Sequence, residues 1–153
     1  MILYLECYPD EALANSLGIS IKHIDHSKGR NKVCDSLCKT VENKGLIDED
    51  PLQVQHPIQK EWKLQSTQFK VKYFKDEKRG HKIICLCPDL ENWIVEVAKA
   101  EKIDLKKDFR LENNAKDLHK VIHLRLTQFK ELVKELENRQ SKPILHLKSL
   151  LNL

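Results

Sequence analysis

Three acidic residues carry the clearest chemical signal in this sequence. Glu6 follows the apolar run Ile2–Leu5 and stands where a buried strand would end. Asp48 and Asp50 follow a second short apolar segment, and alternation along an extended chain puts both on the same side. Carboxylates that converge repel one another, and Mg²⁺ or Mn²⁺ held between them relieves that repulsion. We therefore predict a divalent-metal site; the alternative is that these acids are turn residues and helix caps.

Strand and helix patterns alternate along the first third of the chain and would position these acids. Strands are predicted at residues 2–5, 19–26 and 45–48, with helices at 11–17 and 31–43. A β-α-β-α-β order with short connections predicts right-handed crossovers and a parallel sheet. Ligands of such sheets bind beyond the carboxyl ends of the strands, which is where the three acids fall.

The rest of the chain predicts two more strands and a helical end. The strands lie at residues 69–74 and 81–87, the helices begin near residues 89, 115 and 144, and residues 52–67 are predicted to be a polar loop. Residues 115–136 show the longest amphipathic pattern and predict one continuous helix. We expect a single three-layer α/β domain with a mainly parallel sheet of four or five strands and helices on both faces. Residues 1–103 would form its core and 104–153 a helical extension.

A basic turn precedes the second predicted helix. Lys28, Arg30 and Lys32 would lie at its N-terminus, where backbone N–H groups and the helix dipole favour an anion. They are candidates for a phosphate-binding group, or else they form a solvated turn. His26, at the end of the preceding strand, is a candidate for proton transfer or phosphate contact, or a strand-end histidine without such a role.

Composition limits the classes of protein to which the chain can belong. No apolar run approaches the ~20 residues that a bilayer span requires, and the first residues lack a basic leader. Five cysteines form an odd set, and their C-x3-C and C-x-C spacings are irregular for structural zinc. We expect a cytoplasmic protein with reduced thiols and no membrane partner. The formal net charge of +4 is a weak indication of an anionic partner such as DNA or RNA.

The order of these features resembles the Toprim domain. The matching stretches are LECYPDEAL at 5–13, HSKGRNKV at 26–33 and GLIDEDP at 45–51. The family's glutamate falls on Glu6, its two aspartates fall on Asp48 and Asp50, and Asp10 matches an acid of OLD-like members. CPDLENWIV at 87–95 also resembles a segment of Toprim-like proteins linked to restriction and abortive infection, and it adds Glu91 as a further metal ligand.

The resemblance implies a Mg²⁺- or Mn²⁺-dependent phosphodiester enzyme, and we expect a nuclease that acts on nucleic acid in defence or DNA processing. Glu6, Asp48 and Asp50 would be the catalytic ligands. The alternative is a non-catalytic Toprim-like module that serves as a subunit of a defence or toxin–antitoxin system. In that case the 115–136 helix would be the surface for a homodimer or a protein partner.

Overall fold

One six-stranded sheet organises the fold. The computed structural model describes all 153 residues and gives the strand order β2-β1-β3-β6-β5-β4. The strands are β1 (Leu3–Leu5), β2 (Ile24–His26), β3 (Lys44–Asp48), β4 (Lys63–Gln68), β5 (Val71–Asp76) and β6 (His81–Leu86). The first four in spatial order pair in parallel; β5 pairs antiparallel with β6 and β4 pairs antiparallel with β5, so β5 alone runs against the other strands. This confirms the α/β class and the mainly parallel sheet. The predicted number of strands, about four or five, is wrong because the sheet has six.

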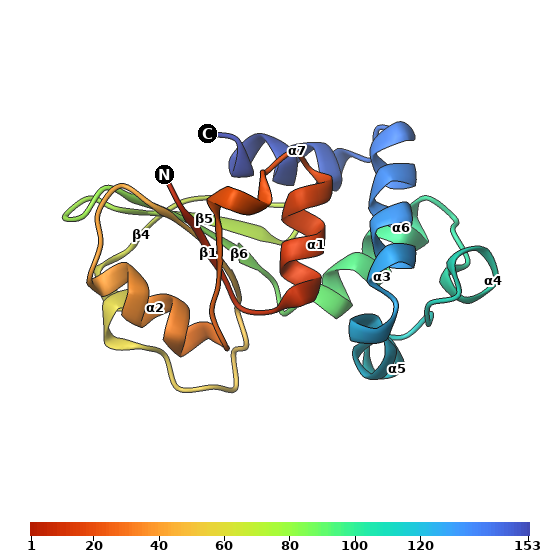
Figure 1. Cartoon of the computed structure of the whole chain (residues 1–153), viewed down its shortest axis with the longest axis horizontal. Helices are drawn as coiled ribbons and strands as arrows, with labels where there is room; N and C mark the ends of the chain where they lie inside the picture. The colour runs from red at the N-terminus through yellow and green to blue at the C-terminus, as the bar shows by residue number, and fades with distance from the viewer.

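Seven α-helices surround the sheet. They are α1 (Tyr8–Ser16), α2 (Arg30–Cys38), α3 (Leu90–Ala100), α4 (Leu105–Phe109), α5 (Ala115–Val121), α6 (Leu126–Asn138) and α7 (Lys142–Leu151), with short 3₁₀ turns η1 (Ile21–His23), η2 (Pro57–Glu61) and η3 (Ile122–Leu124). In Figure 1, α2 lies on one side of the sheet and α1 and α7 lie on the other, while α4 and α5 lie farthest from the sheet. None of the helices combines the length and apolar character that crossing a bilayer requires.

Alternation along the strands divides the apolar side chains between two cores. Leu3 and Leu5 of β1 face the larger core, which also includes residues of α1, α3, α6 and α7. Tyr4, between them, faces the smaller core, together with Val33 and Leu37 of α2. This two-residue period is expected of strands covered on both faces. The strands that carry the acids are therefore packed against side chains on both faces of the sheet.

The predicted single helix over residues 115–136 is wrong. The chain forms α5, passes through η3 and Arg125, and starts α6 in a new direction. No proline or glycine marks the break; Arg125 adopts φ −131° and ψ 43°, and its guanidinium donates to the carbonyl of Arg110. The break lets Leu118 and Phe129 both reach the larger core. Tertiary packing thus overrides a continuous helical pattern.

The predicted polar loop over residues 52–67 is wrong in its second half. Residues 57–61 form η2, and β4 begins at Lys63. β4 is an edge strand whose side chains are mostly exposed, so it lacks the apolar alternation that reveals a strand. Its turn into β5 uses Phe69 and Lys70 at φ 53° and 55°, without the glycine or asparagine that usually marks such a turn.

Two other predicted elements are shorter in the structure. The strand predicted at 19–26 is reduced to β2, because residues 21–23 form η1 and Ile21 is exposed. The helix predicted at 31–43 ends at Cys38, and Val41 is 64 % exposed. Neither change moves the carboxyl end of a strand.

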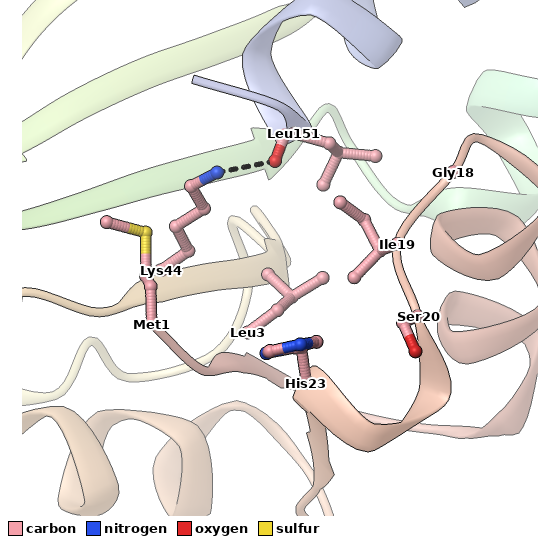
Figure 2. Close-up of a pocket in the computed structure, with 8 residues that line it drawn as sticks. All are labelled: Met1, Leu3, Gly18, Ile19, Ser20, His23, Lys44 and Leu151. Carbon is pink, nitrogen blue, oxygen red and sulfur yellow. Dashed lines mark hydrogen bonds between the residues drawn. The ribbon is translucent and has the colours of Figure 1, made fainter.

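The C-terminal helix α7 is bonded to the amino ends of the parallel strands, opposite the ends that carry the acids. Lys44, at the start of β3, is buried and its Nζ donates to the carbonyl oxygen of Leu151 at 2.6 Å. Leu151 is the last residue of α7, where a cation also interacts favourably with the helix dipole. Figure 2 shows this bond at the side of a pocket of about 260 Å³ whose other walls include Leu3, Ile19 and His23. The amino ends of the strands are therefore anchored by α7, away from the acids.

Candidate functional site

Two adjacent parallel strands bring three carboxylates together. Glu6 directly follows β1, Asp48 ends β3, and Asp50 lies two residues beyond it. One carboxylate oxygen of each lies within 4.8 Å of one from each of the others. We call these three residues the acidic cluster. Its members come from segments 42 residues apart in the sequence, and the pairing of β1 with β3 is what makes them neighbours.

Backbone N–H groups fix two of these carboxylates. The N–H of Asp48 donates to Oε2 of Glu6 at 2.5 Å, and the N–H of Leu90 donates to Oδ1 of Asp48 at 2.9 Å. The second oxygen of each carboxylate makes no hydrogen bond within the chain. One oxygen therefore sets the orientation of each group, and the other is left for a ligand.

Three helices begin at this edge of the sheet. They are α1 at Tyr8, α2 at Arg30 and α3 at Leu90, each following a parallel strand that ends there. A helix N-terminus carries a partial positive charge and unpaired N–H groups. This arrangement partly offsets the negative charge of the cluster, and it is also suited to an anion such as phosphate.

Two further acids surround the cluster. Asp10 is 2 % exposed, and its Oδ2 accepts hydrogen bonds from the backbone N–H and the thiol of Cys7 at 3.2 and 3.1 Å. Glu91 is buried at the start of α3, and its Oε1 lies 3.1 Å from Nδ1 of His119. Their negative charges act on Asp48, so both belong to the electrostatic surroundings of the cluster.

The cluster strongly disfavours its own ionisation. Burial raises the pKa of Glu6 to about 8, with contributions from the charges of Asp10 and Asp50. Burial and the same kind of repulsion raise the pKa of Asp48 to about 10. The pKa of Asp10 is raised to about 7, chiefly by burial. Burial also raises the pKa of Asp50, although the charge of Arg30 acts against that. Near neutral pH, a bound cation would be needed for all of these groups to ionise together.

Arg30 is buried beside the cluster, but its guanidinium is used by the protein's own backbone. It donates to the carbonyl of Glu49 and, through Nη2, to the carbonyl of Val54 at 3.1 Å. It therefore holds the loop that carries Asp50. Its charge also lowers the pKa of Glu6 and Asp50. Of the predicted phosphate-binding residues, Arg30 is the one whose charge acts on the cluster.

The other predicted phosphate-binding residues lie on the outer side of the same edge. Lys28 and Lys32 are exposed and line a polar cleft of about 320 Å³, whose remaining walls are Ser27, Asp35, Ser36 and Lys39. We call this the basic cleft. The turn that leads into it needs Gly29, which has φ 93° and whose N–H donates to the carbonyl of Glu6 at 3.3 Å. This bond ties the basic cleft to the end of β1.

His26 lies at the end of β2 beneath an aromatic ring. Its imidazole stacks on Tyr8 with centroids 4.2 Å apart and planes inclined by 22°. Its Nε2 is buried without a hydrogen-bond partner. In the sheet, His26 is paired with Leu5, the residue before Glu6. The predicted residue is therefore close to the cluster in the sheet, but its ring is part of an aromatic stack.

Sequence reasoning missed two contributors to the site. Asp89 was interpreted only as a residue that opens a helix; it does cap α3, and its charge also acts on Asp50. His119 is an exposed histidine to which the sequence assigns no role, and its Nδ1 lies 3.1 Å from Oε1 of Glu91, a residue 28 positions away. For Asp89 the signal was present, since an acid that follows a parallel strand falls at the same edge. For His119 no local pattern exists, because the contact depends on how α5 packs on α3.

The geometry supports two kinds of chemistry at this edge. Half-buried carboxylates with free oxygens suit a hard divalent cation, and the helix N-termini with the basic cleft suit a phosphorylated ligand. Comparison adds no relatives from which to transfer a function: no protein-family model, curated protein or solved structure matches this chain.

Proposed function

We propose that this chain is a Toprim-like, Mg²⁺- or Mn²⁺-dependent phosphodiester enzyme, specifically a nuclease. One observation carries the proposal: Glu6, Asp48 and Asp50 approach within 4.8 Å of one another at the ends of adjacent parallel strands. A nonpolar replacement or an amide would be less costly at these half-buried positions than three acids. A cation-binding role accounts for keeping the acids there.

The donor set fits a hard divalent ion. Mg²⁺ takes oxygen ligands at about 2.0–2.1 Å, so ligands on opposite sides of one ion lie about 4.2 Å apart. A spread of up to 4.8 Å requires only small side-chain rotations to meet that geometry. Glu6 and Asp48 each offer one free oxygen, and Asp50 extends from a loop that Arg30 holds in place. The charges of Asp10 and Glu91 act on Asp48 from the adjoining helices, and in the proposal these two residues would be the further ligands that the resemblance implies.

Each part of the site has a role in phosphodiester hydrolysis. In that reaction a water oxygen bonds to phosphorus, the bond from phosphorus to the leaving oxygen breaks, and the leaving oxygen takes up a proton. The bound ion would supply an acidified water and stabilise the charge on the phosphoryl oxygens. Glu6, Asp48 and Asp50 would hold the ion, while Lys28 and Lys32 bind neighbouring phosphates of the substrate from the basic cleft.

The proposal also places the protein in the cytoplasm, where reducing conditions keep thiols free. All five cysteines are unpaired in the structure. Its partner would be DNA or RNA rather than a membrane. The context we infer is defence or DNA processing, on the basis of the Toprim-like motifs.

The alternative, a non-catalytic module that docks through residues 115–136, has less support. The apolar side chains that suggested a docking face, including Leu118, Phe129 and Leu136, are buried in the chain's own core. That leaves mostly polar side chains of α5 and α6 for a homodimer or a protein partner. The acidic cluster would have no role in such a module.

A cleavage assay with matched variants tests the proposal. Single-stranded and duplex oligonucleotides are incubated with Mn²⁺ and either wild-type protein, Asp50→Asn or Asp108→Asn. Asp50 has φ 42°, which asparagine tolerates, so the amide removes the charge with little strain. Asp108 is exposed on α4, far from the cluster in the fold, and serves as the control. We expect Asp50→Asn to lose about a hundredfold in rate, since each ligand contributes several kcal/mol of stabilisation. Equal rates for all three proteins would refute the proposal.

A further inference from the structure

The edge of the sheet carries an exposed aromatic ring that the proposed hydrolysis does not use. Tyr8 is the first residue of α1, two positions after Glu6, and is 55 % exposed. One face of its ring rests on His26 at a centroid distance of 4.2 Å. Its hydroxyl makes no hydrogen bond within the chain, so the chain's own hydrogen bonding does not explain a tyrosine here.

The His26 ring supports Tyr8 from below. His26 ends β2 and is paired with Leu5 of β1, so the two rings come from adjacent segments of the same rigid edge. The N–H of Ser27 donates to the carbonyl of Leu5 at 2.8 Å, which fixes the chain on the far side of His26. With one face covered and the edge anchored, the other face of Tyr8 is held ready for a flat ligand.

Three features follow one another across this edge. Strand order places β2 outside β1 and β1 next to β3, so the Tyr8–His26 stack adjoins Glu6, and Asp48 lies one strand farther in. The basic cleft begins at Ser27, the residue that follows His26. A flat aromatic surface, a cationic cleft and an acidic cluster therefore lie side by side. They match the base, the flanking phosphates and the metal-coordinated phosphate of one nucleotide chain.

We propose that Tyr8, supported by His26, is a stacking platform for an unpaired nucleobase, and that the substrate is therefore single-stranded nucleic acid. This inference rests on the proposed function and specifies its substrate. Bases in a duplex are stacked on each other and cannot lie on a protein ring, whereas an unpaired base can. The backbone would run from the platform along Lys28, Lys32 and Lys39.

The experiment measures binding without hydrolysis. Fluorescein-labelled oligothymidylate, oligouridylate and the thymidylate–adenylate duplex are titrated by anisotropy in EDTA at low salt, where phosphate contacts are strongest. The proteins are wild type, Tyr8→Leu, Tyr8→Phe and, as the matched control, Phe69→Leu. Phe69 is another exposed aromatic residue, in the β4–β5 turn. The two single strands distinguish a DNA substrate from an RNA substrate.

We expect Tyr8→Leu to weaken single-strand binding about tenfold, the usual effect of losing one base–aromatic stack. Tyr8→Phe keeps the ring and should bind as wild type does, and Phe69→Leu should change nothing. Duplex should bind more weakly than either single strand and should not respond to Tyr8→Leu. In wild-type protein, photo-cross-linking of a 5-bromouracil oligonucleotide should label the peptide that contains Tyr8, a result that does not require any variant to fold.

The inference is overturned if Tyr8→Leu binds as wild type does, if duplex binds as tightly as single strand, if no single strand binds, or if the cross-link maps elsewhere. Its failure is distinct from failure of the proposed hydrolysis. Tyr8-dependent binding without cleavage in Mn²⁺ would refute the hydrolysis alone. Cleavage without Tyr8-dependent binding would refute the platform alone.

Discussion

The backbone N–H of Asp48 donates a 2.5 Å hydrogen bond to Oε2 of Glu6, joining the end of β3 to the side chain that follows β1. The bond stabilises the ionised form of Glu6, yet burial outweighs it and the pKa of Glu6 is raised to about 8. The hydrogen bond thus orients the Glu6 carboxylate, but it is too weak to keep that carboxylate ionised at neutral pH without a nearby cation.

The metal-free protein should lose stability as pH rises from about 5 to about 8. Glu6 and Asp48 have raised pKa values of about 8 and about 10 in the folded chain, against ordinary values of 4.5 and 3.8. Across this range the folded state holds protons that the unfolded state has released, so the free energy of unfolding falls with pH. Each such carboxyl contributes a slope of up to about 1.4 kcal/mol per pH unit. Urea denaturation in EDTA at several pH values measures it.

The matched variant for this pH dependence is Asp48→Asn. It removes a carboxyl that must take up a proton when the chain folds and keeps an acceptor for the N–H of Leu90, so it should flatten the profile and be more stable than wild type at about pH 8. A wild-type protein whose stability rises between about pH 5 and about pH 8 would contradict the assignment of buried, destabilised carboxyls.

Arg30→Met should destabilise the fold by about 3 kcal/mol, because the guanidinium satisfies two loop carbonyls in a buried setting. Those carbonyls belong to Glu49 and Val54, on either side of Asp50. Urea denaturation measures the loss, with Lys28→Met as the control because Lys28 is exposed in the turn before the same helix. We expect the control to remain within about 0.5 kcal/mol of wild type. A stability for Arg30→Met equal to that of the control would show that the loop is not held in this way.

Lys44→Met should loosen α7. The substitution removes the hydrogen bond from Nζ to the carbonyl of Leu151 and the favourable charge at the end of that helix, together about 1–2 kcal/mol. Amide hydrogen exchange should quicken in residues 148–151 and remain slow in β1. Lys82→Met is the control, since Lys82 is in register with Lys44 on the neighbouring strand and makes no such bond. Unchanged exchange in α7 would contradict the anchoring role.

The positions of Glu6 and Asp48 could be predicted because each stands at the end of a short run of buried strand residues. Apolar runs such as Leu3–Leu5 are visible in a sequence, and parallel topology then places both strand ends at one edge. Asp10 and Glu91 became candidates only through the resemblance to the Toprim domain; in the structure they lie in the first turns of α1 and α3, the helices that start at that edge.

What could not be predicted depends on tertiary packing or lacks an apolar pattern. β4 is a polar edge strand, and the turn from β4 into β5 has no glycine, so no pattern in residues 63–70 predicts a hairpin. The break at Arg125 occurs within an uninterrupted amphipathic pattern, because packing in the larger core favours a change of direction there. The contact of His119 with Glu91 depends on the packing of α5 against α3, and the stacking of Tyr8 on His26 depends on the pairing of β1 with β2.

Calorimetric titration with Mn²⁺ tests the central claim most directly. Wild-type protein and Asp108→Asn should bind Mn²⁺ with the same affinity and release protons on binding, because the buried carboxyls must ionise to coordinate it. Asp50→Asn and Asp48→Asn should lose about tenfold or more in affinity, because each loses a carboxylate ligand. Absence of Mn²⁺ binding by the wild-type protein, or equal affinity in all four proteins, would show that Glu6, Asp48 and Asp50 are not a metal site.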